Sequence, residues 1–328
     1  MSLSQKPWYG VNLASERLGA KALYANDDFF APKERMLQDS DPVFIPGKYD
    51  DNGKWMDGWE TRRKRGEGYD YCIVKLAVPG RLNKIELDTR HFTGNYAPAA
   101  LVEACFSTTE PNTETVWWPI TDTIALAGND QKLVDIEHDE VFSHIRLNIY
   151  PDGGIARLRV FGQPEVDWST LANRSVDLLA LEVGGRAIAT NDEHFGTMHN
   201  LNLPGKGINM GDGWETRRRR EPGNDWVILA LGHRGEIDQV VIDTAFFEGN
   251  YAAACSIQVA DIHNLPDSTL PAQSLYWKEL LPKSELSADQ EHLFTDILKE
   301  VGPVTHLRVN IYPDGGISRI RVIGKPVI

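Results

Sequence analysis

An internal repeat constrains this chain more than any other feature of its sequence. Four motifs recur in the same order in each half: YANDDFF (24–30) and ATNDEHF (189–195), DGWETRR (57–63 and 212–218), LDTRHFTGNYA (87–97) and IDTAFFEGNYA (242–252), and NIYPDGGI (148–155 and 310–317). The copies are offset by 155 residues at Asp57 and Asp212, and by 162 residues at Asn148 and Asn310. Solenoid repeats have periods of about 20–50 residues, so each copy here is predicted to be a domain.

The length of the chain agrees with two domains. It has 328 residues, and a domain usually takes roughly 150. We predict a first repeat over residues 1–165 and a second over 172–328. The segment GQPEVDWSTLANRS (162–175) is the natural linker, because it is polar, contains a proline and follows the last strand-like run of the first copy.

Most of the sequence has the period of β-strands. Apolar and polar residues alternate at 144–150 and 155–161, with the turn PDGG between them, and again at 306–312 and 317–323. This pattern predicts, in each copy, a hairpin of two half-buried strands. Further strands are predicted at 71–78, 83–89 and 226–232. Short strands with turn residues and little helix indicate an all-β chain with one β-sandwich per copy.

One segment has the pattern of a helix. Residues 284–301 place Leu293, Phe294, Ile297, Leu298 and Val301 at helical spacing, and Ser287 with Gln290 resembles a capping box. We therefore expect the main helix of the chain here.

Charge and composition exclude several classes of protein. The formal net charge is −13, which argues against binding to nucleic acid or to an anionic membrane. The runs RRKR (62–65) and RRRR (217–220) are flanked by acids, so they do not change this view. The N-terminus lacks the apolar core of a signal peptide, and no stretch approaches the roughly 18 apolar residues of a membrane span. The three cysteines form no CxxC pair. We predict a cytoplasmic protein with reduced, mostly buried thiols.

Several charged or amide residues stay the same between the copies, whereas apolar positions change. They are Asp27, Asp57, Glu60, Arg62, Arg63, Asn95, Asp152 and Arg157 in the first copy, and Asp192, Asp212, Glu215, Arg217, Arg218, Asn250, Asp314 and Arg319 in the second. Arginine can bind a carboxylate with two parallel hydrogen bonds, and a carboxylate beside it can act as a general acid or base. The alternative is a local network of ion pairs that holds a loop on the sandwich.

Metal binding has one weak indication. His194 and His199 lie beside Asp192 and Glu193, in the second copy only. Imidazole and carboxylate are good metal ligands, so a divalent metal is an open possibility here. No other cofactor is indicated, because the glycine-rich pieces form no nucleotide-binding motif.

The motifs GDGWETRRRR (211–220), GNDW (223–226), FFEGNYA (246–252) and RVNIYPDGGISRIRV (308–322) resemble the allantoicase family, and the doubled layout matches it as well. The resemblance covers residues 10–325. It implies two tandem jelly-roll β-sandwich domains of the galactose-binding-like type. It also implies hydrolysis of allantoate to ureidoglycolate and urea in purine degradation. The first copy has Lys64 in place of Arg219 and GYDY (68–71) in place of GNDW, which leaves open whether both copies are catalytic.

The residue types suggest which residue would have each role in such a reaction. Arg217 or Arg218 would bind the carboxylate of allantoate, and Asn250 with Tyr312 would bind its ureido groups. Glu215 or Asp212 would protonate the departing urea, and Asp192 or Asp314 would activate water. Arg319 is a further candidate for substrate binding. The first-copy counterparts are Asp27, Asp57, Glu60, Arg62, Arg63, Asn95, Tyr150, Asp152 and Arg157.

Two other classes of function remain open from the residues alone. A non-catalytic module would bind a small molecule or a carbohydrate, with Trp59 and Trp214 as stacking platforms for a sugar ring. A structural interaction protein would bury the polar loops in an interface. A homo-oligomer is compatible with each of these hypotheses.

Overall fold

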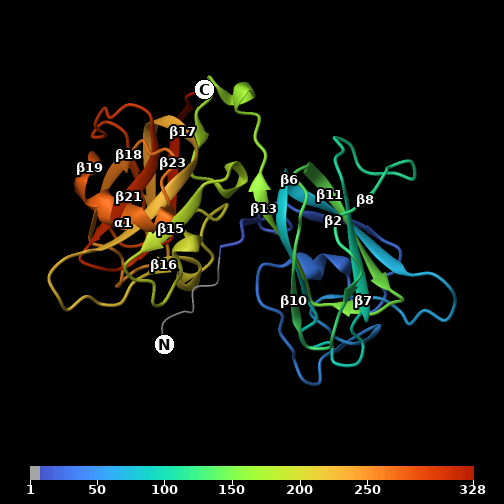
Figure 1. Ribbon diagram of the computed structural model, residues 1–328. Coiled ribbons are helices and arrows are strands. Elements are labelled where there is room, and N and C mark those ends of the chain that lie inside the picture. The colour runs from blue at the N-terminus through green and yellow to red at the C-terminus, as the bar shows by residue number, and fades with distance from the viewer. Residues whose placement is uncertain (1–7) are drawn as a thin grey trace. The chain divides into compact units, whose positions relative to one another are not determined.

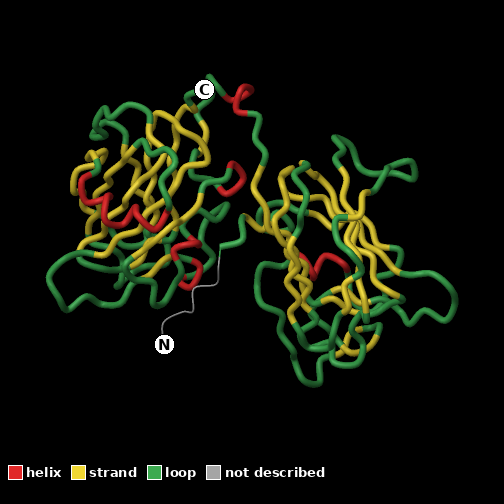
Figure 2. Tube along the Cα trace, viewed as in Figure 1, coloured by secondary structure: helices red, strands yellow, loops and turns green. Residues whose placement is uncertain are grey.

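The computed structural model describes residues 8–328 of the chain. It divides into two compact units between Glu165 and Val166, here called the first and the second repeat. Strands make up most of the ordered structure in both (Figures 1 and 2). The prediction of an all-β chain with two related domains is confirmed.

The first repeat consists of thirteen strands and one short 3-10 helix. The strands are β1 (Val11–Asn12), β2 (Lys21–Ala25), β3 (Tyr49–Asp50), β4 (Gly53–Lys54), β5 (Trp59–Glu60), β6 (Asp70–Asp88), β7 (Ala99–Cys105), β8 (Trp118–Pro119), β9 (Ile124–Ala125), β10 (Gln131–Asp135), β11 (Val141–Tyr150), β12 (Gly154–Ile155) and β13 (Arg157–Pro164), and the helix is η1 (Lys33–Leu37). Since β13 runs to Pro164, the first three residues of the predicted linker belong to a strand.

The second repeat has the same plan with more helical turns. Its strands are β14 (Val176–Asp177), β15 (Arg186–Thr190), β16 (Trp214–Glu215), β17 (Asp225–Asp243), β18 (Ala254–Ala260), β19 (Lys278–Glu285), β20 (Glu291–Phe294), β21 (Val304–Tyr312), β22 (Gly316–Ile317) and β23 (Arg319–Pro326). The helical turns are η2 (Trp168–Leu171), η3 (Leu181–Val183), η4 (Met198–Asn200), η5 (Met210–Asp212), η6 (Asp267–Thr269), α1 (Leu270–Gln273) and η7 (Ser274–Tyr276).

One long strand organises each repeat. In the first, β6 has 19 residues and contains the predicted strand 71–78 and all but the last residue of the one at 83–89. The N-terminal half of β6 pairs with β2 and β11, and its C-terminal half pairs with β10 and β13. In the second repeat β17 does the same, pairing first with β15 and β21 and then with β20 and β23.

This arrangement makes the hairpin prediction wrong. The strand order is β1-β13-β6-β11-β7-β8, so β11 and β13 each pair with β6 but not with each other. The strands β21 and β23 are likewise separated by β17. Alternation shows that a strand is half buried, but two strands on either side of a core have the same alternation as two strands of a hairpin. The PDGG segment is therefore a crossing connection.

The helix predicted at 284–301 is also wrong. Its first two residues end β19, and Glu291–Phe294 form β20, which pairs with Val240–Asp243 of β17. Leu293 and Ile297 of the predicted apolar stripe are exposed, whereas Phe294 is buried. Pairing to a long central strand satisfies the backbone here and overrides the helical spacing, while Phe294, Leu298 and Val301 still pack against the core.

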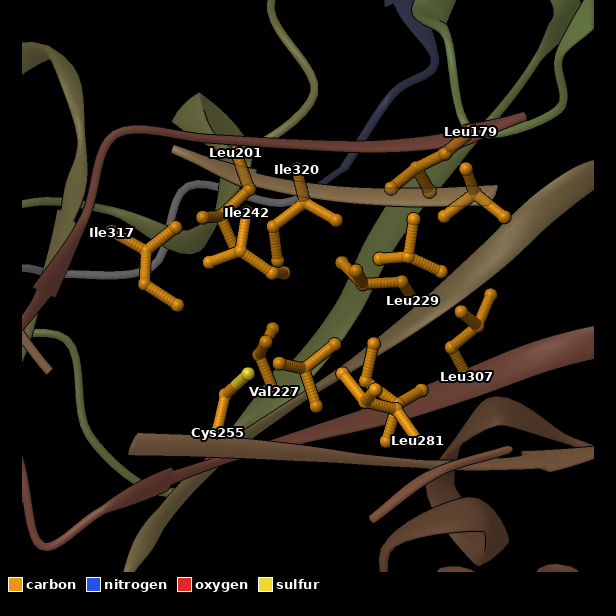
Figure 3. Packing of buried hydrophobic residues seen from close by; sticks show 14 of the residues in the cluster. Leu179, Leu201, Val227, Leu229, Ile242, Cys255, Leu281, Leu307, Ile317 and Ile320 are labelled. Atoms are coloured by element: carbon orange, nitrogen blue, oxygen red, sulfur yellow. The ribbon is translucent and has the colours of Figure 1, made fainter. Parts of the chain in front are cut away.

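The core of the second repeat lies between the two halves of β17. Val227 and Leu229 from the first half, Ile242 from the second, Leu307 of β21 and Ile320 of β23 are fully buried in one cluster (Figure 3). Burial of such a side chain contributes about 1.5–3 kcal/mol relative to exposure. The alternation in the sequence therefore identified the correct inward-facing side of these strands.

Two further features bear on the setting of the protein. Within residues 8–328, no helix is long and apolar enough to cross a membrane. Cys72, Cys105 and Cys255 are free and buried, as predicted. Burial raises the pKa of the Cys105 thiol to about 11 and that of Cys255 to about 12, so these thiols are poor nucleophiles at neutral pH.

Candidate functional site

The repeated motifs meet in space at one place in each repeat. In the second, DGWETRR and PDGGI pair through β16 and β22, with Trp214 opposite Ile317 and Glu215 opposite Gly316. The loop GNYA joins them, because Tyr251 forms a bridge with Gly316. In the first repeat β5 and β12 pair in the same way, and Tyr96 bridges to Gly154. The motifs found in the sequence therefore build one loop cluster per repeat.

The two glycines of PDGG are needed for this close approach. Gly315 has φ +132°, a conformation that side chains disfavour. A Cβ on Gly316 would lie 2.1 Å from Cε1 of Phe247, and one on Gly154 would lie 2.1 Å from Cε1 of Phe92. The glycines are therefore fixed by packing against the phenylalanine that precedes GNYA.

Asp212 and Arg319 form a buried ion pair. Nη2 of Arg319 donates to Oδ2 of Asp212 at 2.5 Å, and Nη1 donates to the Asp212 carbonyl oxygen. Arg319 is 2% exposed and Asp212 9%. In the first repeat, Arg157 pairs with Asp57 at 2.8 Å. These contacts attach the loop that carries the aspartate to the strand that carries the arginine.

The carboxylates of Asp192 and Asp314 accept hydrogen bonds from the arginine run. Asp192 accepts from the backbone N–H of Arg217 at 2.6 Å and from its Nε at 3.0 Å. Asp314 accepts from the backbone N–H of Arg219 at 2.7 Å. Asp27 with Arg62 and Asp152 with Lys64 repeat these contacts in the first copy. Both aspartates thus fix the path of the loop that carries the arginines.

A glutamate and an asparagine form a second contact of the loop cluster that recurs in both repeats. Nδ2 of Asn250 donates to Oε1 of Glu215 at 2.5 Å, and Nδ2 of Asn95 donates to Oε1 of Glu60 at 2.7 Å. Burial raises the pKa of the Glu60 carboxyl, against the lowering effect of the Asn95 hydrogen bond. A raised pKa favours the protonated form, which a general acid requires.

A cleft of about 320 Å³ lies beside the arginine run of the second repeat. Its lining residues are Asn191, Asp192, Arg217, Arg218, Arg219, Arg220, Glu221 and Asp225. Arg217 pairs with Asp192 and Arg219 pairs with Asp225. Within residues 8–328, Arg218 and Arg220 are exposed and form no ion pair. The same holds for Arg63 and Arg65 in the first repeat. The cleft therefore presents guanidinium groups that are free to bind an anion.

Some candidates lie elsewhere. The hydroxyl of Tyr312 is 2.9 Å from that of Ser256, and the ring of Tyr150 packs on Tyr69 with centroids 4.9 Å apart. Neither the cleft lining nor the Glu215–Asn250 pair includes Tyr312. The structure thus brings Asp192, Arg217 and Arg218 into one cleft, and Glu215 with Asn250 into an adjoining pair.

The predicted sugar platforms are wrong. Trp59 and Trp214 are both 0% exposed. Their indole N–H groups donate to the carbonyl oxygens of Asp27 and Asp192, each at 2.9 Å. The tryptophans are core residues that attach the acidic loop to the sandwich, and a sugar ring has no access to them.

The histidines suggested for a metal do not form a cluster. Within residues 8–328, no group of three or more His, Cys, Asp and Glu side chains could hold a metal ion. The His194 ring packs edge-on against Phe195. Burial lowers the pKa of His199, and the charge of Glu193 opposes this effect. His194 and His199 are therefore not assembled into a metal centre with other ligands.

Five residues that line the cleft were missed as site candidates from the sequence: Asn191, Arg219, Arg220, Glu221 and Asp225. The Asn191 Nδ2 donates to Oδ1 of Asp225 at 2.9 Å, and that oxygen also accepts from Arg219. The first repeat has the same contact between Asn26 and Asp70. Both asparagines stand in the recurring motif before Asp27 and Asp192, so their repetition was the signal available.

Fold and loops together define the class. The chain is a tandem pair of β-sandwiches in which each copy presents an arginine loop next to a glutamate–asparagine pair, an arrangement that fits a small anionic molecule with amide groups. The family model for the allantoicase repeat matches residues 11–165 and 176–327. The chain therefore belongs to the allantoicase family.

Similar proteins agree along nearly the whole chain. A probable allantoicase of Pseudomonas syringae pv. tomato is 53% identical over 317 residues, which cover 96% of each chain. Probable allantoicase 1 of Burkholderia mallei is 56% identical over 316 residues, or 96% of this chain and 94% of that one. The crystal structure of allantoicase from Saccharomyces cerevisiae has a TM-score of 0.78 and 33% identity, covering 96% of this chain and 92% of that one. The predicted pair of jelly-roll β-sandwiches is thereby confirmed.

Proposed function

We propose that this chain hydrolyses allantoate to ureidoglycolate and urea, with one site in the loop cluster of each repeat. Membership of the allantoicase family supports the reaction. The observation that carries the site is the free guanidinium of Arg218, and of Arg63 in the first repeat, three residues along the chain from the glutamate of a glutamate–asparagine pair. The substrate carries one carboxylate and two ureido groups on one carbon, and the loop cluster offers a group for each.

In this proposal Arg218 binds the substrate carboxylate and Glu215 acts as the general acid. Three residues of extended chain span at most about 10 Å, so a substrate held by Arg218 can reach Glu215. Asn250 orients the Glu215 carboxyl through its 2.5 Å hydrogen bond. As the bond from the central carbon to one ureido nitrogen breaks, Glu215 gives that nitrogen a proton and urea leaves. The oxygen of water then joins the carbon as a hydroxyl group, and the other proton of that water returns to the Glu215 carboxylate.

Other predicted residues take positioning roles in this proposal. Asp192 and Asp314 were candidates to activate water, but their oxygens accept hydrogen bonds from the arginine run. Asp212 and Arg319 are buried against each other. We infer that these four hold the loop, so that Arg218 and Glu215 keep a fixed separation.

Urea release from allantoate by the purified protein tests the reaction. Glu60→Gln and Glu215→Gln should each leave about half of the turnover, because one repeat remains intact. The double variant should lose at least about a hundredfold, which is the usual contribution of a general acid. A folded double variant with near-wild-type turnover would show that these glutamates are not the acids.

The arginines allow a matched comparison. Arg63→Ala with Arg218→Ala should lower kcat/KM by roughly 10–100-fold, since a hydrogen-bonded charged group contributes about 1.5–3 kcal/mol. Arg65→Ala with Arg220→Ala removes the same charge two residues further along the same loops and should change kcat/KM much less. Equal losses in both pairs would mean that general positive charge, and not Arg218, attracts the substrate.

The same assay with EDTA addresses the metal. Loss of urea release in EDTA, restored by a divalent metal, would direct attention to His194 and His199. Full activity in EDTA would support the arginine and glutamate mechanism alone.

We also propose that the chain acts in the cytoplasm, without nucleic acid. Its free buried cysteines suit a reducing compartment, and its net charge of −13 opposes binding to phosphate backbones. Cell fractionation and gel-shift measurements test these two points, and sedimentation analysis would show whether the chain forms the homo-oligomer that the sequence allows.

A further inference from the structure

The two repeats differ on one face of the sandwich. Along β21, Leu307, Val309 and Ile311 are buried in the core. Arg308, Asn310 and Tyr312 alternate with them and therefore lie on the opposite face of the sheet. In the first repeat β11 places Arg146, Asn148 and Tyr150 at the corresponding positions. The same three residue types thus occupy the outer face of both repeats.

In the first repeat the arginine has a carboxylate partner. Arg146 on β11 lies opposite Glu103 on β7 in the strand register. Its Nε donates to Oε2 of Glu103 at 2.7 Å, and Nη2 lies 2.7 Å from the same oxygen. Nδ2 of Asn148 donates to that oxygen as well. The charge of Arg146 is therefore neutralised within the repeat.

In the second repeat the partner is neutral. Arg308 lies opposite Gln258 in the identical register. Its Nε donates to Oδ1 of Asn310 at 2.9 Å, its Nη1 donates to Oγ of Ser274 at 2.6 Å, and its guanidinium lies 4.5 Å from the ring centre of Trp226. Within residues 8–328, no carboxylate forms an ion pair with Arg308. All of its contacts are with uncharged groups.

The nearest acidic residue in the strand register already forms an ion pair with another residue. Glu279 on β19 lies opposite Gln258, but it forms an ion pair with Lys299. Lys283 on the same strand adds a second positive charge, with its Nζ 4.5 Å from the ring centre of Tyr312. This outer face is therefore positive, although the chain as a whole is strongly acidic.

Because Arg308 is buried, the lack of a carboxylate partner has an energetic cost. Arg308 is 5% exposed, and an arginine taken out of water without a partner is costly. Burial lowers the pKa of Arg308, which is the direction expected for a cation without an acid beside it. Its Nη2 has no hydrogen-bond partner among the described residues. That nitrogen therefore retains a donor for a ligand.

We propose that the outer face of the second repeat binds a small carboxylate at Arg308, and that the first repeat lacks this site because Glu103 already neutralises Arg146. The ligand carboxylate lies at Nη2 of Arg308, because the side-chain amide of Gln258 occupies the place of the Glu103 carboxylate and accepts a hydrogen bond from Nδ2 of Asn310 at 3.1 Å. Ser256 and Tyr312, whose hydroxyls are 2.9 Å apart, provide hydrogen bonds to a polar group of the same ligand. The site is additional to the proposed reaction at Arg218 and does not depend on it.

A binding experiment with N-carbamoylglycine tests this proposal. This molecule has one carboxylate and one ureido group but lacks the carbon with two ureido groups at which allantoate would be cut. Calorimetric titration is made on the full chain with Arg63→Ala and Arg218→Ala, which removes the two arginines proposed for the reaction. This chain should still bind one molecule of N-carbamoylglycine.

Two exchanges between the repeats then locate the binding. Adding Gln258→Glu installs beside Arg308 the carboxylate that Arg146 already has, and it should weaken binding at least about tenfold, because like charges at one site cost several kcal/mol. Adding Glu103→Gln instead should raise the stoichiometry toward two by opening Arg146. Both exchanges copy a pair that one repeat already folds with.

The outcomes separate this proposal from the proposed reaction. Absence of saturable binding in the background chain, or binding unchanged by Gln258→Glu, would overturn the outer-face site whatever the result for urea release. Loss of binding with Gln258→Glu would support it, even if the wild-type chain released no urea.

Discussion

Replacing Arg319 by methionine is expected to destabilise the second repeat by about 3–5 kcal/mol, the usual loss when one partner of a buried ion pair is removed. Arg319 is 2% exposed, and its two terminal nitrogens donate to the carboxylate and the carbonyl of Asp212. Without it, a carboxylate that is 9% exposed loses the guanidinium that neutralises its charge. Such a loss lowers the melting temperature on the order of 10 °C in a domain of this size.

Urea denaturation followed by circular dichroism measures this free energy. Arg157→Met is the matched variant, since Arg157 is 0% exposed and pairs with Asp57 in the first repeat. Combining Arg319→Met with Asp212→Leu should recover most of the loss, because no buried charge then remains unpaired. A loss below about 1 kcal/mol for Arg319→Met, the level of a surface pair, would refute the argument from burial.

The same residues test the division between loop support and chemistry. In folded protein that carries Asp57→Asn and Asp212→Asn together, turnover should stay close to that of the wild type while stability falls. If turnover were abolished and stability kept, Asp212 would be a catalytic acid and its assignment as a positioning residue would be wrong.

Two further changes should have measurable effects. Gly316→Ala should destabilise the chain by several kcal/mol, as strained core substitutions do, because the new Cβ would lie 2.1 Å from Phe247, whereas Gly249→Ala meets nothing within 4 Å and should be nearly neutral; equal melting temperatures would contradict the packing argument. His306 should make the chain less stable in acid. Burial, with a smaller effect of Arg186, lowers the pKa of His306 from 6.5 to about 4. Below pH 6.5, His306 is therefore protonated in the unfolded chain but stays neutral in the folded one. The free energy of unfolding falls as the pH is lowered from 6.5 to about 4. His306→Gln should reduce the fall between pH 7 and pH 5 by at most about 2 kcal/mol, measured by urea titration at both pH values; an unchanged slope would mean that other groups cause it.

The repeat in the sequence predicted most of the fold, because doubled motifs and a period of two require no knowledge of tertiary contacts. It could not predict the partners of each strand. The residues on either side of PDGG alternate as in a hairpin, yet β11 and β13 are separated by β6. The segment 284–301 failed for a similar reason, since β20 is defined by its pairing with β17 rather than by its own residues.

For the site, the sequence identified the correct loops but did not show which charged side chains are held in ion pairs and which are free. Asp57 and Arg157 are 100 residues apart, and only the fold shows that they neutralise each other beneath the loops. The adjacent arginines Arg217 and Arg218 are equivalent in the sequence, whereas in the structure one is held by Asp192 and the other is free. Recurrence between the copies identifies candidate residues, but it does not distinguish residues that hold a loop in place from residues that bind or react with the substrate.

The long strands β6 and β17 have a consequence for motion. Each is hydrogen-bonded to strands of both layers of its sandwich. Separation of one layer would therefore break hydrogen bonds of a strand that also belongs to the other layer. Local opening should therefore be suppressed in the layers and confined to the loops and edge strands. In hydrogen exchange, amides of β11 and β13 should lose protection together with those of β6, at one common free energy, as a single unit rather than as two sheets.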